Sequence, residues 1–330
     1  MRHLTRQTEA RYRSRDKTAG RPADANAAIL DSIYRYPVKG LSPEPYQRVL
    51  LRTGQTLPND RRYAIENGPS GFDPAAPKWL PKAYFLMLMR NERLAALQTH
   101  YDDDTSVLTI CHDGRDAVQG NLETEQGRAA VEHYLSDYCA SELKGSPKVL
   151  SAPPHSFSDV AKKVVSIINL SSVLAIEDLL GRPVDPLRFR ANLYVRRWPA
   201  WSEFDLLDKA IAIGGARLRI MRRIVRCAAI NVDPVTAQRD LEIPETMQLR
   251  FGHADCGVYA EVISDGEITI GDAVELMGDN RWLAGAELTL ADLYTAPMFD
   301  YFLKAPEGRN MIREHENLAT WWSRALRGPQ

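Results

Sequence analysis

Four cysteines are the side chains of this 330-residue chain best suited to act as a nucleophile or a soft metal ligand. None belongs to a C-x-x-C pair, and four thiols in a chain of this length make neither a disulfide scaffold nor a zinc ribbon. We therefore expect reduced thiols and a cytoplasmic protein. Cys111 and Cys139 have no evident activating neighbour and are expected to be structural, because free cysteine is among the most buried residue types.

Cys227 lies directly after a short cationic run. Arg222, Arg223 and Arg226 precede it, and positive neighbours favour the thiolate, which is the nucleophilic and metal-binding form. The same arginines would also suit an ordinary strand that exposes arginine on one face and buries apolar residues on the other. The local sequence leaves both interpretations of Cys227 open.

Cys256 lies between a polar loop and the apolar strand that we expect from Val258 to Ile263. Gly257 beside it favours access to the thiol, and His253 precedes it by three residues and could polarise the sulfur. A functional and a structural Cys256 remain equally open on these grounds.

Lysine and arginine gather near expected turns. Lys39 follows a proline, Arg61 follows an Asn-Asp pair, and Arg188 and Arg190 flank Phe189 just before an expected strand. Arginine binds phosphate through paired hydrogen bonds, and lysine supplies a point charge. Together, a thiolate and clustered guanidinium groups suit a metal–organic cofactor that carries a phosphate.

Composition excludes several classes of protein. The net charge is −1 and the sequence pI is about 6.7, so the chain as a whole carries no electrostatic signature of nucleic-acid binding. No segment approaches the roughly 18 uninterrupted apolar residues that a membrane-spanning helix needs. The length predicts about two domains.

Hydrophobic periodicity and turn residues divide the chain into four parts. Residues 1–27 are basic and poor in large apolar side chains, so we expect a disordered extension. Residues 28–148 are dominated by short strands with one helix, and residues 149–278 contain the short strands of a small barrel. Residues 279–330 are helical and open with a capping box at Thr289 and Asp292. Short strands are expected at 84–90 and 227–232, among others.

Five motifs in this chain resemble those of the MOSC family, which is named for the C-terminal domain of molybdenum cofactor sulfurases. The resemblance is closest to the two-domain branch that contains the bacterial and mitochondrial amidoxime-reducing proteins. The motifs run from Ile33 to Lys39, from Asn59 to Arg61, from Leu187 to Asn192, from Arg226 to Pro234 and from Gly266 to Asp272.

The resemblance implies a mainly β, α+β fold in which a MOSC β-barrel packs on an N-terminal β-barrel-like domain, followed here by a short helical appendage. It also implies that molybdopterin, the molybdenum cofactor, binds between the two domains, and it allows pyridoxal phosphate as a ligand. The residues carried over as cofactor contacts are Lys39, Arg61, Arg188, Arg190, Asn192, Arg226 and Cys227.

The chain departs from the family pattern at the expected metal ligand. His253 occupies the position that aligns most simply with the ligand cysteine of the amidoxime reducers, and the nearest thiol is Cys256. We therefore expect Cys256 to be the catalytic residue and the molybdenum ligand, with Cys227 as the second candidate. Gly40 and Ala191 replace the usual serine and proline of two other motifs.

The family implies a reductase of N-hydroxylated or N-oxide compounds. No G-x-G-x-x-G fingerprint for a flavin or nicotinamide is present, so electrons would come from a partner protein of the ferredoxin, flavodoxin, cytochrome or flavoprotein type. One alternative is a sulfur carrier, with a cysteine persulfide, or a protein that handles the cofactor. Another is a binding protein whose tail recruits a partner to an inert barrel.

The tail resembles the final helices of glutathione S-transferases, from the Thr289–Asp292 capping box to Trp322. The thioredoxin-like glutathione domain of those enzymes is absent from the sequence, so the resemblance does not imply glutathione chemistry. The simplest expectation is a helix pair that packs on the barrel or forms a dimer contact.

Overall fold

The computed structural model describes residues 27–277, 282–283 and 288–327. The expected disordered extension, residues 1–27, lies outside these residues except for its last position. Among the described residues, no helix has the length and apolar character needed to cross a membrane.

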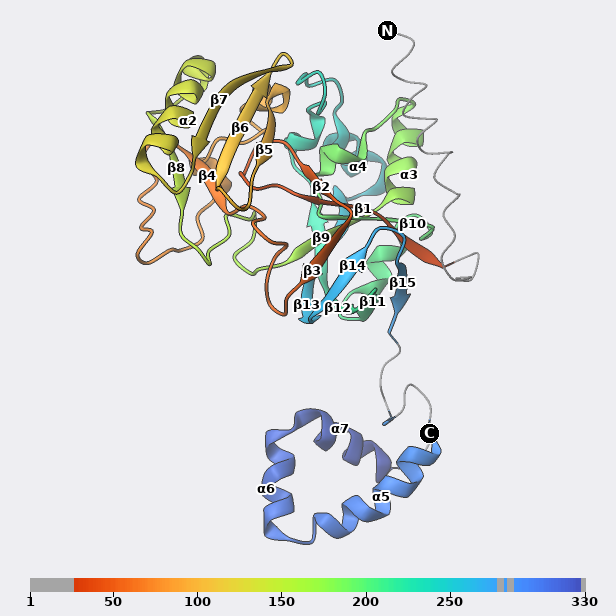
Figure 1. Ribbon diagram of the computed structural model, residues 1–330. Helices are drawn as coiled ribbons and strands as arrows, with labels where there is room; N and C mark the ends of the chain where they lie inside the picture. Colours follow the sequence, from red (N-terminus) through yellow and green to blue (C-terminus); the bar gives the residue numbers. More distant parts are fainter. Residues whose placement is uncertain (1–26, 278–281, 284–287, 328–330) are drawn as a thin grey trace.

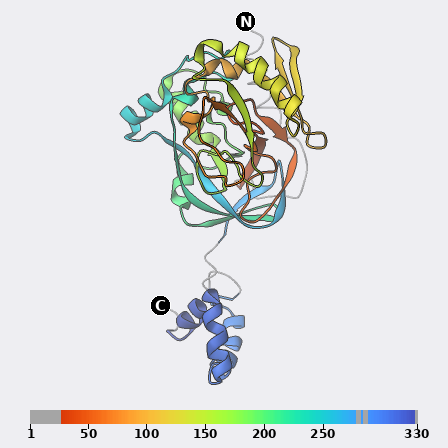
Figure 2. The same cartoon turned by 90° about the vertical axis from the view of Figure 1, so that its left-hand side faces the viewer.

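Seven strands close into a β-barrel (Figures 1 and 2). Around the barrel their order is β10-β9-β13-β12-β11-β15-β1, and β1 pairs with β10 to close the ring. Only β9 and β10 are parallel among these neighbours. The strands are β1 (Ala28–Arg35), β9 (Val165–Asn169), β10 (Leu193–Arg196), β11 (Ala210–Ile213), β12 (Ala216–Val225), β13 (Asp255–Ser264) and β15 (Ala273–Leu276).

Alternation of side chains explains how the barrel buries its core. On β12, Leu218 and Ile220 are buried inside, whereas Arg217 and Arg219 between them are exposed. Successive side chains of a strand point to opposite faces, so such a strand has one apolar and one polar face. Strand β2 (Glu44–Tyr46) extends the sheet from β1, and β3 (Arg48–Leu51) pairs with β14 (Gly266–Thr269).

The N-terminal domain is built from two small sheets and one long helix. One sheet pairs β4 (Tyr63–Asn67) with β8 (Pro147–Ser151). The other contains β5 (Gln98–Tyr101), β6 (Val107–His112) and β7 (Arg115–Asn121), beside helix α2 (Glu125–Tyr138). The expected helix is confirmed, and the Thr124 hydroxyl caps it by accepting from Gly127 N.

Two expected features differ in the structure. The segment 84–90 is no strand: a 3₁₀ turn at Lys82–Tyr84 is followed by an irregular chain with one isolated bridge between Glu66 and Phe85. In addition, β1 belongs to the barrel and not to the N-terminal domain, because it is held between β10 and β15. The polypeptide thus enters the barrel before it forms the N-terminal domain.

Two helices pack against each other, and the first of them lies on barrel strands β9, β10 and β13. They are α3 (Leu170–Leu180) and α4 (Ile243–Phe251), which pack with neighbouring loops around a separate apolar core. The Asn169 side chain caps α3 by accepting a hydrogen bond from Ser171 N. Helix α4 was not anticipated.

The C-terminal helices form a separate unit, which lies away from the barrel and the N-terminal domain in Figure 1. They are α5 (Leu290–Phe302), α6 (Pro306–Glu314) and α7 (Glu316–Ala325). The predicted capping box of Thr289 and Asp292 is present, and the Asp292 carboxylate also accepts a hydrogen bond from Trp321 Nε1 at 2.8 Å. A mainly β fold with a barrel and a helical tail is therefore confirmed.

Candidate functional site

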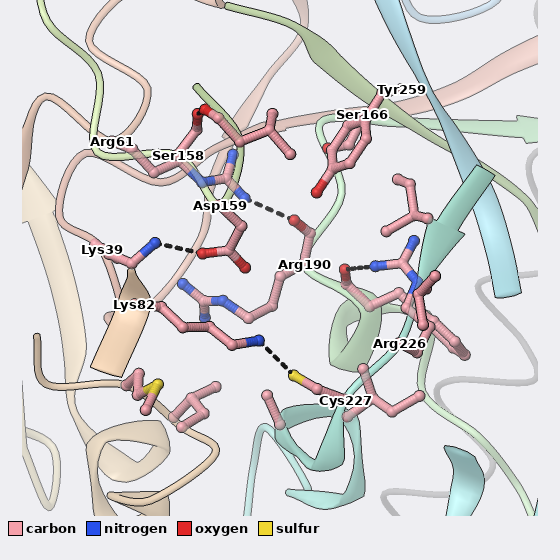
Figure 3. Close-up of a pocket in the computed structure, with 18 of the residues that line it drawn as sticks. Lys39, Arg61, Lys82, Ser158, Asp159, Ser166, Arg190, Arg226, Cys227 and Tyr259 are labelled. Carbon is pink, nitrogen blue, oxygen red and sulfur yellow. Dashed lines mark hydrogen bonds and ion pairs between the residues drawn. The ribbon is translucent and has the colours of Figure 1, made fainter. Parts of the chain in front are cut away.

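A cavity of about 350 Å³ lies between the N-terminal domain and the barrel (Figure 3). This volume falls within the range of small-molecule sites, which runs from about 300 to 1,000 Å³. Eight lysines and arginines line the cavity against two aspartates, so its charge favours an anionic ligand. The cations are Lys39, Arg61, Lys82, Arg188, Arg190, Arg222, Arg223 and Arg226, and the acids are Asp60 and Asp159.

Lys39 enters the cavity from the N-terminal domain, where its backbone N–H bonds Tyr63 O. Its ammonium donates to Phe157 O at 2.9 Å and to the Asp159 carboxylate. Burial raises the pKa of Asp159, but the attraction of Lys39 outweighs this effect and lowers the pKa to about 2. The Asp159 side chain is half exposed. Because its pKa is low, it is negatively charged at neutral pH and lies among the cations of the cavity.

Arg61 and Arg190 come from different domains and hold their guanidinium groups over the same ring, that of Tyr36. Each guanidinium carbon lies 4.4 Å from the ring centroid. Both arginines have positive φ, 49° and 51°, a conformation that is uncommon outside glycine and gathers at functional sites. The fold therefore holds this pair in place at some conformational cost.

The two guanidinium groups differ in how their charge is balanced. Arg61 bonds the buried carboxylate of Asp60 at 2.6 Å. Arg190 instead donates a hydrogen bond to a carbonyl, Leu41 O, at 2.7 Å, and burial lowers the pKa of its guanidinium. A buried cation without a carboxylate is stabilised by an added anion. Arg190 is thus a strong candidate to bind a phosphate.

Cys227 is the thiol that lines the cavity. Lys82, from the N-terminal domain, donates a hydrogen bond from Nζ to the Cys227 sulfur at 3.0 Å. Burial lowers the pKa of Lys82, but the hydrogen bond and the electrostatic attraction to Cys227, together with the attraction of Asp159, raise it above its usual value. The expected strand at 227–232 is absent, because the chain leaves the sheet after Val225 and forms a 3₁₀ turn at Ala228–Asn231.

Cys256 does not reach the cavity. Its side chain is fully buried in the apolar core beneath α3 and α4, and burial raises its pKa to about 12. Only its carbonyl oxygen faces the site, where it accepts a hydrogen bond from Arg226 Nε at 2.7 Å. Of the two candidate ligands that the sequence offers, Cys227 therefore lines the cavity and Cys256 does not.

His253 also lies away from the cavity. Its ring packs with the rings of Trp201, Phe204 and Phe251, and its Nδ1 accepts from Asp255 N at 3.1 Å. The position that aligns most simply with the family cysteine thus holds an aromatic packing residue.

Three further expected contacts line the cavity but are held by protein groups. The Arg188 guanidinium, 1% exposed, bonds Asp233 and Asp240, each at 2.8 Å. Asn192 accepts from Ser166 and donates to a backbone carbonyl. Both side chains are thus already held by protein groups. Arg226 donates hydrogen bonds to the carbonyl oxygens of Cys256 and Phe189, so its charge still contributes to the cavity.

The other two thiols lie elsewhere. Cys139 is buried, as expected, whereas Cys111 is partly exposed and donates to the Asp116 carboxylate at 2.9 Å. Within the described ranges, no group of three or more His, Cys, Asp or Glu residues is placed to hold a metal ion.

Sequence reasoning missed Lys82, Asp159 and Tyr36. Lys82 and Cys227 are 145 residues apart in the chain, and Lys39 and Asp159 are 120 apart. Neither Lys82 nor Asp159 lies in a local sequence pattern that suggests a site. Tyr36 belongs to the first motif and was the one of the three with a usable signal.

The fold and the lining residues together define a β-barrel protein with a cationic cavity beside the barrel. The MOSC N-terminal beta barrel domain model matches residues 27–142, and the MOSC domain model matches residues 152–275. The chain belongs to the MOSC family. Residues 273–329 match the glutathione S-transferase C-terminal domain.

Two solved structures show distant likeness. The YuaD protein from Bacillus subtilis is 12% identical, with a TM-score of 0.34 over 76% of this chain and 95% of that chain. YiiM from Geobacillus stearothermophilus is 16% identical, with a TM-score of 0.29 over 46% of this chain and 76% of that chain. A comparison with curated proteins found no match. The family assignment rests on the two domain models.

Proposed function

We propose that this chain binds molybdopterin in the cavity between its domains and reduces N-hydroxylated or N-oxide compounds. The observation that carries the proposal is a cationic cavity that also presents one thiol, with Lys82 Nζ 3.0 Å from the Cys227 sulfur. Family membership supports the cofactor class, since MOSC domains typically bind the molybdenum cofactor.

The residues present fit the chemistry of this group. Arg190, Lys39 and Arg226 would hold the anionic phosphate, and the Cys227 sulfur would be the protein ligand of molybdenum. When bound, the cofactor would supply a metal centre that exchanges electron pairs. Lys82 would keep the sulfur oriented toward the cavity through its hydrogen bond.

Reduction of an N–OH group to N–H consumes two electrons and two protons and releases water. We infer that the electrons come from a partner protein of the ferredoxin, flavodoxin, cytochrome or flavoprotein type, and that the substrate is a small molecule. The cytoplasmic location remains a prediction.

Metal analysis of three forms of the protein tests the proposal. Wild type, Cys227→Ser and Cys256→Ser are purified from a host that makes the cofactor, and molybdenum and pterin are measured per chain. We expect molybdenum and pterin in wild type and in Cys256→Ser. In Cys227→Ser we expect loss of molybdenum and a smaller amount of pterin. A wild type without molybdenum contradicts the function, and loss only in Cys256→Ser contradicts the ligand assignment.

A sulfur carrier is the second candidate, and the same contact favours it. A thiol at a cavity wall beside an ammonium group can attack the outer sulfur of a donor persulfide, which forms a new persulfide on the protein and releases the donor as a thiol. Mass spectrometry distinguishes the two functions. One extra sulfur atom on Cys227, with no metal, supports the carrier, whereas molybdenum and pterin support the reductase.

A further inference from the structure

Exposed apolar side chains gather on one face of helix α5. Leu290, Tyr294, Met298 and Tyr301 follow the helical spacing of four, four and three residues, which places them on one side of the helix. Their exposed fractions lie between 69% and 77%. Leu293, 56% exposed, borders the same face. We call these five residues the α5 face.

The opposite side of α5 already has its partner. Phe299 packs edge-on against Trp321 of α7, with ring centroids 5.3 Å apart, and Asp292 is buried at the start of the helix. The α5 face therefore points away from the core of its own unit. A helix with apolar residues on opposite sides normally lies inside a protein, and among the described residues nothing covers the α5 face.

The area of the α5 face suits a protein interface. A large apolar side chain buries up to about 150–250 Å², so five such residues at these exposures offer on the order of 600 Å². That value reaches the upper end of the largest apolar patches on monomers, about 300–600 Å². It also supplies most of the roughly 800 Å² that each partner contributes to an interface of standard size.

The barrel and the N-terminal domain offer no comparable surface for this face within the described residues. None of their described helices or strands carries more than two exposed large apolar residues, for example Leu50 on β3, Leu249 and Phe251 on α4, and Leu276 on β15. Figures 1 and 2 both show the helical unit apart from them. The surface of matching size and character is the same face on another copy of the chain.

We propose that the α5 face docks against the α5 face of a second copy. A two-fold axis brings identical patches together, so each residue of the face meets apolar residues of the other copy. Charge opposes this pairing little: of the two acidic residues of α5, Asp292 is buried, and Asp300, at the border of the face beside Leu293, pairs with Lys304 at 3.6 Å. The inference is independent of the cavity and its ligand.

Sedimentation velocity of the full chain tests the proposal. We expect a dimer for wild type and a monomer for Tyr294→Glu, which places a charge in the centre of the α5 face and weakens dimerisation about 100-fold or more. Thr320→Glu, at an exposed position of α7 away from this face, should dimerise as wild type does. Far-UV circular dichroism checks that each variant keeps its helices.

Two results overturn the proposal. One is a wild type that stays monomeric up to about 100 µM, where even micromolar affinity populates the dimer; this is the outcome if the face docks within its own chain. The other is a Tyr294→Glu variant that dimerises as wild type does. If Tyr294→Glu loses helical content, Met298→Lys takes its place and should likewise be monomeric. Met298→Leu is its apolar control and should dimerise as wild type does.

Discussion

Replacing Asp159 by asparagine should lower stability and strengthen anion binding at the same time. The carboxylate lies among the cavity cations and binds the Lys39 ammonium (Figure 3). The variant keeps the shape of the side chain but removes its charge. Lys39 then loses its carboxylate partner in a buried setting, while a bound phosphate no longer faces a negative neighbour.

The pKa of Asp159 sets the size of the stability effect. The shift from 3.8 to about 2 corresponds to at most about 2.4 kcal/mol, at 1.36 kcal/mol for each pKa unit. Because half of the side chain is exposed, solvent screening reduces this to about 1 kcal/mol. For anion binding, one repulsive charge at close range amounts to on the order of 1.4 kcal/mol, or about tenfold in affinity.

The pH dependence has a defined sign. A carboxyl whose pKa is lower in the folded state stabilises the protein above its unfolded pKa, and this contribution is lost as the pH falls through the folded pKa. The stability gap between wild type and Asp159→Asn should therefore be about 1 kcal/mol at neutral pH and should shrink from about pH 4 toward pH 2.

Urea unfolding across this pH range measures the gap, and calorimetric titration with pyrophosphate measures anion affinity. Glu261→Gln is the matched control, because it removes one charge from a surface pair with Lys162 at 2.7 Å, outside the cavity lining. It should change either quantity only slightly. The reasoning is refuted if Asp159→Asn matches wild type at neutral pH, if its deficit persists undiminished at low pH, or if its pyrophosphate affinity is unchanged. If wild type and Asp159→Asn both fail to bind pyrophosphate, the cavity itself is not an anion site.

Two further predictions concern the scaffold. Gly257→Ala should lower the free energy of unfolding by at least about 2 kcal/mol in urea, because φ is +75° and the new Cβ would lie 2.4 Å from Ile167 O. Gly252→Ala is the control: its φ is +77° but its surroundings are open, so the loss should be only about 1 kcal/mol. Equal losses in the two variants would contradict this account. Asp292→Asn should lower the helix content of the tail at neutral pH in far-UV circular dichroism. Hydrogen bonds to Asp292 hold its pKa at about 2 against the effect of desolvation, so wild type should lose the same stabilisation as the pH falls from about 4 to 2, and a pH-independent difference would refute the role of the charge.

Much of this protein is determined by local sequence. Alternation along β12, the cap of α2 and the Thr289–Asp292 box follow from residue types a few positions apart, because they depend on strand and helix periods and on local hydrogen bonds. The same holds for the order of the five motifs and for the family that they indicate. Lys39, Arg61, Arg190 and Arg226 were identified as candidates in this way.

Only the tertiary structure decided which thiol serves the cavity. Cys227 and Cys256 each stand beside a strand and a polar or cationic segment, and sequence favoured Cys256. The strand carrying Cys256 directs that thiol into the core beneath α3 and α4, whereas the chain turns out of the sheet at Cys227 and meets Lys82 from the other domain. Whether a side chain is buried depends on which separate segments pack around it, such as α3 and α4 around Cys256 or Lys82, 145 residues away, beside Cys227. The residues next to each cysteine in the sequence do not determine that packing.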